Sequence, residues 1–322
     1  MPHAPYFIVL NAGSGHEETS GQRAIIEEAL LASGHPFELA VVEDPSQLQA
    51  TARHMLEAAR AAGGTIVAAG GDGTINTVAG MAVGSGCPFG VLPQGTFNYF
   101  GRTHGIPEDL GDAVAALLTA SVQPVQVGVV NERIFLVNAS IGLYPQIIEE
   151  READKRQFGR SRLVALLSMI KTALGARQYL HIRLATSGAQ RKMRTPMLFI
   201  GNNSLQIGQL GLLPLSAALE DGKLAAIAPK SVGTLGMIGL MVRGALGRLG
   251  DAANLVSFGF ERMTVKQLTL YGKRRRIKVA LDGEVTLLDT PLRFSVITDR
   301  LLLLKPSKDS GIDAANNDRA VA

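Results

Sequence analysis

The length, composition and charge of the chain exclude several classes of protein. At 322 residues it exceeds what one hydrophobic core usually holds, so two domains are expected, and 46% hydrophobic residues with 36 glycines suit an α/β enzyme. A single cysteine, Cys87, excludes an internal disulfide framework and is interpreted as a buried structural thiol. The net charge of +4 does not choose among phosphates, anionic membrane surfaces and nucleic acid as partners.

The N-terminus and the apolar runs predict a cytoplasmic chain without a membrane-spanning helix. No basic region precedes the short apolar run after Met1, so no signal peptide is predicted. The longest apolar stretch, Val232 to Val242, is far shorter than the roughly 20 residues that span a bilayer.

Residues 1–122 alternate between strand and helix patterns. Their near-continuous apolar strands predict a buried parallel sheet, with ligands at the carboxyl ends of the strands. The expected strands are Tyr6–Leu10, Pro36–Val42, Thr65–Ala69 and Phe89–Leu92, and the expected helices are Gly21–Ala32, Ser46–Ala62 and Thr74–Val83, with helical patterns continuing through Leu118.

Residues 123–306 carry many short β-rich runs, which predict a mainly antiparallel β-sandwich domain. The expected strands are Gln123–Val130, Ile134–Asn138, Tyr179–Ala185, Pro196–Ile200, Lys223–Ala228, Glu261–Leu270, Ile277–Leu281, Leu292–Thr298 and Leu301–Leu304. Two helical inserts are expected at 146–176 and 232–249, the second with its apolar stripe packed on the sandwich rather than on a membrane. The polar tail, 307–322, is predicted to be disordered.

The strongest local signal is the segment Gly70-Gly-Asp-Gly-Thr-Ile-Asn76, which follows an apolar strand and begins a helix. Backbone N–H groups at such a turn, with the helix N-terminus, form a concave anion site suited to polyphosphate. Asp72 would repel a bare phosphate, so it is more natural opposite a magnesium ion or a nucleotide hydroxyl. A simple turn capped by Asp72 or Thr74 is the alternative, but it needs fewer glycines. Neither a Walker loop nor a dinucleotide fingerprint is present.

Four further segments join polar residues to glycines, in this order: Asn11-Ala-Gly-Ser-Gly15, Leu92-Pro-Gln-Gly-Thr-Phe-Asn98, Leu219-Glu-Asp-Gly-Lys223 and Leu281-Asp-Gly-Glu284. With the Gly70 loop, the set resembles the diacylglycerol kinase catalytic domain family, which includes bacterial lipid kinases and sphingosine and ceramide kinases. NAD kinase and phosphofructokinase share the GGDG loop alone, so the four further segments favour the lipid kinases. The resemblance covers about residues 6 to 305.

The resemblance implies the fold and the nucleotide site. It implies an NAD kinase/diacylglycerol kinase-like α/β domain with a parallel sheet, followed by a mainly antiparallel β-sandwich domain. ATP and Mg²⁺ are the implied cofactors. The residues implied to hold the nucleotide are Asn11, Ser14, Gly70, Gly71, Asp72, Gly73, Thr74, Ile75, Asn76 and Thr96.

The resemblance also implies roles in the second domain. Asp221 is implied to bind a structural magnesium ion, helped by the backbone carbonyls of Ala218 and Lys223. Glu284 is implied to take the proton from a lipid hydroxyl as it attacks the γ-phosphoryl group, with Asp282 beside it. From the residues alone, the segment that holds Asp282 and Glu284 is better interpreted as a hairpin turn.

The run Lys273-Arg-Arg-Arg-Ile-Lys278 places Arg274, Arg276 and Lys278 on one side of a predicted strand. This stripe could meet anionic headgroups or ATP phosphates, and a solvated charged face is an equal alternative. Nucleic acid is not expected as a partner because aromatic residues for base stacking do not accompany the charges.

The expected function is therefore an ATP-dependent lipid kinase that acts between the two domains on a lipid substrate at the membrane surface. It is expected to be cytoplasmic and peripheral to the membrane, with a homodimer left open. Tyr99 and Tyr144 stand where many relatives carry an aspartate, which leaves the acceptor lipid open. A non-catalytic nucleotide- or lipid-binding protein and an NAD kinase remain the alternatives.

Overall fold

The computed structural model describes residues 4–12, 16–146, 148, 180–186, 190–209, 212–229, 260–272 and 274–306. Both predicted helical inserts lie largely outside these residues, and the tail 307–322, Ser14 and Lys273 lie wholly outside them. Within the described residues, no helix is long and apolar enough to cross a membrane.

The chain forms two compact units, one of Met1–Val125 with Leu301–Ala322 and one of Gln126–Arg300. The boundary expected after residue 122 therefore falls after Val125, and the chain returns to the first unit at its end. The return follows from the last strand, β16 (Leu292–Lys305), which is continuous where two strands were expected. Its first half pairs antiparallel with β13 of the second unit, whereas Leu303 pairs in parallel with Phe89 of β4 in the first.

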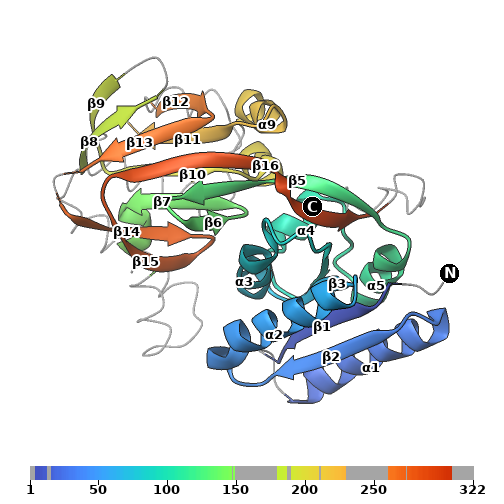
Figure 1. Cartoon of the computed structure of the whole chain (residues 1–322). Helices are drawn as coiled ribbons and strands as arrows, with labels where there is room; N and C mark the ends of the chain where they lie inside the picture. The colour runs from blue at the N-terminus through green and yellow to red at the C-terminus, as the bar shows by residue number, and fades with distance from the viewer. Residues whose placement is uncertain are drawn as a thin grey trace, which may run out of the picture. The chain divides into compact units, whose positions relative to one another are not determined.

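The first unit contains a parallel sheet in the order β2-β1-β3-β4, to which the end of β16 adds a further parallel strand (Figure 1). Its strands are β1 (Tyr6–Asn11), β2 (Phe37–Val42), β3 (Thr65–Gly70) and β4 (Phe89–Pro93). Its helices are α1 (His16–Ser33), η1 (Pro45–Gln47), α2 (Leu48–Ala61), α3 (Asp72–Ala82), α4 (Tyr99–Thr103) and α5 (Leu110–Leu118). Every residue of β3 and β4 is buried, as expected for strands covered by helices on both faces.

The connections of this sheet fix where its helices lie. The chain moves from β1 to β2 on one side and then crosses to β3 and β4 on the other. Since parallel crossovers are right-handed, this reversal places α1 on one face and α2 with α3 on the other. Accordingly α1 packs against α5, and α2 packs against α3. Cys87, two residues before β4, is buried as predicted, and burial raises the pKa of its thiol.

The second unit is a β-sandwich, which confirms the predicted fold class. One sheet is antiparallel, in the order β12-β11-β10-β7-β14-β15, and the other contains β16, β13, β8 and β9, with β5 and β6 beside β16. The bounds are β5 (Ser121–Val130), β6 (Arg133–Phe135), β7 (Asn138–Gly142), β8 (Leu180–Ala185), β9 (Gln190–Thr195), β10 (Met197–Gly201), β11 (Leu224–Pro229), β12 (Phe260–Val265), β13 (Gln267–Tyr271), β14 (Arg276–Leu281) and β15 (Glu284–Asp289).

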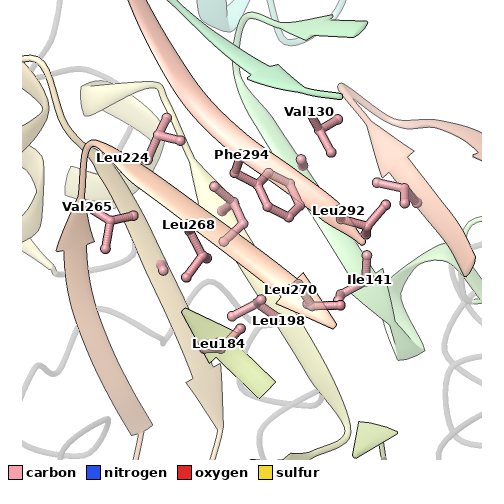
Figure 2. Close-up of a cluster of buried hydrophobic side chains, with 14 of the residues drawn as sticks. Val130, Ile141, Leu184, Leu198, Leu224, Val265, Leu268, Leu270, Leu292 and Phe294 are labelled. Atoms are coloured by element: carbon pink, nitrogen blue, oxygen red, sulfur yellow. The ribbon is translucent and has the colours of Figure 1, made fainter. Parts of the chain in front are cut away.

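Both sheets contribute to one apolar core. Figure 2 shows Leu268, Leu270 and Phe294 of one sheet among Leu198 and Leu224 of the other, and all five are nearly or fully buried. Alternate residues of β11 point away from this core, where Ala225 and Ile227 pack under α8 (Ser204–Gln209) and α9 (Leu213–Glu220). The strand is thus buried on both faces, which explains its unbroken apolar sequence.

Candidate functional site

Three predicted segments meet at the carboxyl edge of the parallel sheet in the first unit. Asn11 ends β1, Gly70 ends β3, and Pro93 ends β4, and the register pairs Leu10 with Ala69 and Gly70 with Pro93. The connections that leave β1 and β3 run to opposite sides of the sheet. A crevice at such a switch point is where open α/β sheets bind ligands.

The glycine loop after β3 forms a tight passage from strand to helix. A Cβ atom on Gly70 would lie 2.8 Å from Oγ1 and 2.9 Å from Cβ of Thr74, so a side chain at this position would collide with the first turn of α3. The first helical hydrogen bond of α3 runs from the Ile75 N–H to the Gly71 carbonyl. The preceding N–H groups, of Asp72, Gly73 and Thr74, therefore have no acceptor within the helix, and they point with its positive dipole end toward an anion site.

Asn11 and Thr74 are brought together although 63 residues separate them. The Asn11 Nδ2 atom donates to Oγ1 of Thr74 at 2.7 Å. Because Oγ1 accepts this bond, the threonine hydroxyl hydrogen is directed elsewhere. This hydrogen bond joins the end of β1 to the start of α3, directly after the glycine loop.

The loop after β4 is fixed by one buried asparagine. Asn98 has a left-handed backbone with φ of 46°, and its side chain accepts from the Gly95 N–H at 2.9 Å and donates to the Gly95 carbonyl at 2.8 Å. A Cβ on Gly95 would lie 3.1 Å from the Cα of Gly71, so the two glycine loops touch. The Gln94 N–H also donates to the Gly70 carbonyl. The sequence motif indicated Thr96 as the functional residue of this loop, but not the positioning roles of Asn98 and Gly95. The tolerance of asparagine for left-handed backbone could have indicated Asn98.

Asp72 is the electrostatically unusual group of this edge. Its Oδ1 atom is buried and has no hydrogen-bond partner among the described residues. Burial raises the pKa of the carboxyl group above its ordinary value, while the backbone N–H groups of Asn98 and Tyr99 oppose the rise. A buried carboxylate oxygen without a donor costs free energy unless a cation or a hydroxyl reaches it. Hard oxygen donors are what Mg²⁺ binds, so this carboxylate fits a nucleotide-bound magnesium ion.

The other predicted nucleotide residues have different environments. Thr96 is exposed on the loop after β4, next to Phe97, whose ring is stacked on Tyr99 at 5.9 Å. Asn76 is half-buried on α3. Ile75 is fully buried, so only its backbone could contact a nucleotide.

In the second unit, Asp282 and Gly283 form the two-residue turn of the β14–β15 hairpin, since Leu281 pairs with Glu284. Both turn residues have positive φ, 47° and 93°, as the favoured hairpin turn requires. The Asp282 carboxylate accepts three backbone N–H groups, from Leu136 at 2.7 Å, Val137 at 2.9 Å and Asn138 at 2.8 Å. Asp282 therefore fixes the start of β7 to the turn, whereas Glu284 is exposed beside it.

A cluster of buried amide and hydroxyl side chains lies at the same end of this sheet, and it was missed from the sequence. Asn138 starts β7, and its Nδ2 donates to Gln206. Asn202 follows β10, donates to the Leu136 carbonyl and accepts from Gln126. Asn138 Oδ1 and Ser140 Oγ are buried without a hydrogen-bond partner among the described residues. Such unsatisfied polar atoms suit recognition of a hydroxyl-bearing ligand.

The predicted structural magnesium site lies at the turn after α9. The Asp221 carboxylate is largely exposed and faces the Lys223 ammonium at 3.3 Å. The Lys223 carbonyl accepts from Gln126, and the Ala218 carbonyl accepts from the Asp221 N–H. The site predicted from one carboxylate and two backbone carbonyls stays a prediction.

Comparisons with known proteins agree with this two-part architecture. A family model of the diacylglycerol kinase catalytic domain matches residues 5–130. A Pseudomonas aeruginosa protein named "Probable lipid kinase YegS-like" is 32% identical over 80% of this chain and 82% of its own length. A Staphylococcus epidermidis protein that also carries a lipid kinase name is 28% identical over 75% of this chain and 76% of its own.

The fold is shared with a solved structure as well. A crystal structure of a diacylglycerol kinase from Bacillus anthracis matches with a TM-score of 0.65 at 16% identity, covering 94% of this chain and 97% of that one. The fold that joins an α/β unit to a β-sandwich is thus the fold of that solved structure. The chain belongs to the diacylglycerol kinase catalytic domain family.

Proposed function

We propose that this protein is an ATP-dependent lipid kinase that transfers the γ-phosphoryl group of ATP to a lipid hydroxyl. The observation that carries the proposal is the buried Oδ1 of Asp72, which has no hydrogen-bond partner within the described part of the chain, beside the N–H groups that begin α3. An anion site with one unsatisfied carboxylate fits a phosphate chain that arrives with its divalent cation. Names of the relatives support a lipid as the acceptor.

In this proposal the first unit binds and orients the nucleotide. The N–H groups of Asp72, Gly73 and Thr74 donate to phosphate oxygens, and Asn11 holds the Thr74 hydroxyl in one orientation. Asp72 holds the magnesium ion, which supplies charge neutralisation to the phosphates when it is bound. Contact between Gly95 and Gly71 keeps the loop after β4 against this site, so Thr96 lies at its margin.

The second unit supplies the proton acceptor. Glu284 takes the proton of the lipid hydroxyl while that oxygen forms a bond to the γ-phosphorus, and the bond from phosphorus to the ADP oxygen breaks. The products are a phosphorylated lipid, ADP and protonated Glu284, which returns its proton to water. Asp282 does not take part in proton transfer, because three backbone amides already occupy its carboxylate. It is a positioning residue for the turn that carries Glu284.

The test uses purified full-length protein with γ-labelled ATP, Mg²⁺ and a broad lipid extract, followed by mass identification of the labelled lipid. Glu284→Gln is expected to lower kcat by roughly 10²- to 10⁴-fold, with nucleotide affinity unchanged. Glu132→Gln is the matched control, because Glu132 is an exposed glutamate of the same unit.

Each outcome of this assay separates the candidate functions. Full activity in Glu284→Gln would contradict the assigned proton acceptor. ATP binding without transfer to any lipid would establish a non-catalytic binding protein, and labelled NADP from NAD would establish an NAD kinase.

A further inference from the structure

The cations of the second unit gather on one surface that the proposed chemistry does not use. On the antiparallel pair β8–β9, His181 lies directly opposite Arg194, and Arg183 lies directly opposite Lys192. All four side chains are exposed. Figure 1 shows β8, β9 and β13 side by side, and the register pairs Tyr271 of β13 with Arg183. Like charges directly opposite each other across strands destabilise a sheet, so the Arg183–Lys192 pair opposes folding.

The same surface continues onto β14. A hollow of about 420 Å³ is lined by Arg274, Arg276 and Lys278 together with His181. A second hollow, of about 510 Å³, shares His181 with the first and is lined by Arg183, Lys192 and Arg194. None of the described residues that line either hollow is acidic, and Arg276 is paired with Asp289 outside the lining at 3.0 Å. We call the two hollows together the basic surface; it holds six arginine or lysine side chains and one histidine.

Apolar side chains are exposed within the basic surface. Leu287 lines the first hollow, is 52% exposed and lies directly opposite Lys278 on the hairpin. Tyr271 is 39% exposed, and the Arg183 guanidinium lies 4.6 Å from its ring centre. A soluble phosphate compound would bind to the cations but would not bury an exposed leucine. A bilayer surface does both, because its headgroups bind the cations and the apolar side chains enter the interface.

We infer that the basic surface docks the protein on membranes that contain anionic phospholipids, with its arginine and lysine side chains on the headgroup phosphates. This inference rests on the proposed function in one respect: a lipid that accepts the phosphoryl group lies in a membrane, so the protein has to reach the membrane surface. Nucleic acid fits less well, since Arg183 already covers the ring of Tyr271, the exposed aromatic group of the surface. The folding cost of the cross-strand pair of Arg183 and Lys192 is then offset when the surface is bound.

The test is co-sedimentation of the full-length protein with vesicles, without ATP. Vesicles contain phosphatidylcholine alone or with roughly 30 mol% phosphatidylglycerol, a composition that gives a negative surface potential. We expect the partition coefficient to be at least about tenfold higher on the anionic vesicles and to fall steeply with added salt. Equal partition into both vesicle types would overturn the inference.

Paired variants separate docking from folding. Lys192→Gln/Arg194→Gln is expected to lower the partition coefficient by roughly thirtyfold, at about tenfold or less for each cation near the surface. Its melting temperature should stay equal or rise, because the like-charge pair of Arg183 and Lys192 is removed. Lys266→Gln/Arg293→Gln, exposed cations of the same unit that line neither hollow, should change partition by less than about twofold.

Two further arms identify the ligand. Leu287→Gln should weaken partition several-fold without changing its salt dependence, because the lost contribution is apolar. Displacement of the protein by roughly 10 mM inorganic phosphate, beyond the effect of equal ionic strength from NaCl, would assign the surface to a small anion instead. Binding of a single-stranded oligonucleotide that is lost in Lys192→Gln/Arg194→Gln, with no vesicle binding, would assign it to nucleic acid. Vesicle binding by a protein that phosphorylates no lipid would retain this inference while rejecting the proposed function.

Discussion

Of the three Asp-Gly pairs in the sequence motifs, the pair at Asp72 in the first unit and the pair at Asp282 in the second have opposite environments. Asp72 begins a helix at the edge of the parallel sheet, and one of its carboxylate oxygens is buried with no hydrogen-bond partner in the part of the chain that the structure describes. Asp282 forms a hairpin turn, and its carboxylate accepts three backbone N–H groups. A carboxylate that accepts hydrogen bonds from the protein stabilises the fold, whereas a carboxylate oxygen without a donor is available to a ligand.

The largest effect that tests this contrast is on activity. Asp72→Asn is expected to lower kcat by roughly 10³-fold, because the magnesium-facing charge is lost. The same change should leave the protein as stable or more stable at neutral pH, since the cost of a buried carboxylate disappears. A thermal melt beside the kinetic assay measures both, and a variant that loses stability together with activity would contradict the assignment.

The pH dependence of this stability difference follows from the raised pKa of Asp72. The folded protein keeps the proton to a higher pH than the unfolded chain does, so stability decreases as pH rises through the ordinary carboxyl range. The stability advantage of Asp72→Asn should therefore be smallest below about pH 4 and largest at neutral pH. Denaturant titrations at several pH values measure it.

Asp282 should show the reverse pattern. Asp282→Ala leaves the N–H groups of Leu136, Val137 and Asn138 without their acceptor, which should cost about 3 kcal/mol of unfolding free energy. Asp282→Asn keeps one acceptor oxygen and should cost less. Urea denaturation measures both, and a loss below about 0.5 kcal/mol for the alanine variant would show that the turn is held by other contacts.

A steric change at the glycine loop gives a somewhat smaller effect. Gly70→Ala places a methyl group against Thr74 and is expected to cost about 2 kcal/mol and to weaken nucleotide binding. Gly21→Ala is the control, because a Cβ at Gly21 would contact nothing within 4 Å. Calorimetry measures the nucleotide affinity of both variants. Equal affinities of Gly70→Ala and Gly21→Ala would show that the glycine loop does not bind the nucleotide.

The smallest effect concerns His104, which packs edge-on against Phe100 in the first unit. Burial, with the Lys305 ammonium nearby, lowers the pKa of His104 to about 3. The folded protein thus stays neutral there while the unfolded chain takes up a proton near pH 6.5, so stability falls as pH drops below that value. His104→Gln should reduce this loss of stability at acidic pH, by about 1 kcal/mol at pH 5.8. If denaturant titrations show the same fall in unfolding free energy at acidic pH for His104→Gln and the wild type, other groups cause that fall.

Much of the fold could be predicted because local pattern and burial agree. The apolar runs of β1, β3 and β4 match strands buried on both faces. By contrast, β9 was missed because its sequence, QRKMRT, is polar, and that polarity is part of the basic surface. We predicted two strands in place of β16, because the charged pair Asp299 and Arg300 is typical of a turn. In the structure both residues are exposed, but the backbone continues as one strand.

The site could be predicted only in part, for a similar reason. Motif spacing located the glycine loop and the Asp282 turn, but not which carboxylate the fold satisfies. That distinction depends on N–H donors that lie more than 140 residues from Asp282 in sequence. The buried polar atoms of Asn138 and Ser140 were missed because each lies in an otherwise apolar strand.

The most direct test of the central claim is transfer of label from γ-labelled ATP into chloroform-extractable lipid by the wild-type protein and by the two aspartate variants. The account predicts transfer by the wild type, at least about a hundredfold less by Asp72→Asn, and activity within about tenfold of wild type for the folded fraction of Asp282→Asn. Label that stays in the aqueous phase with the wild type, or an Asp72→Asn variant as active as the wild type, would contradict it.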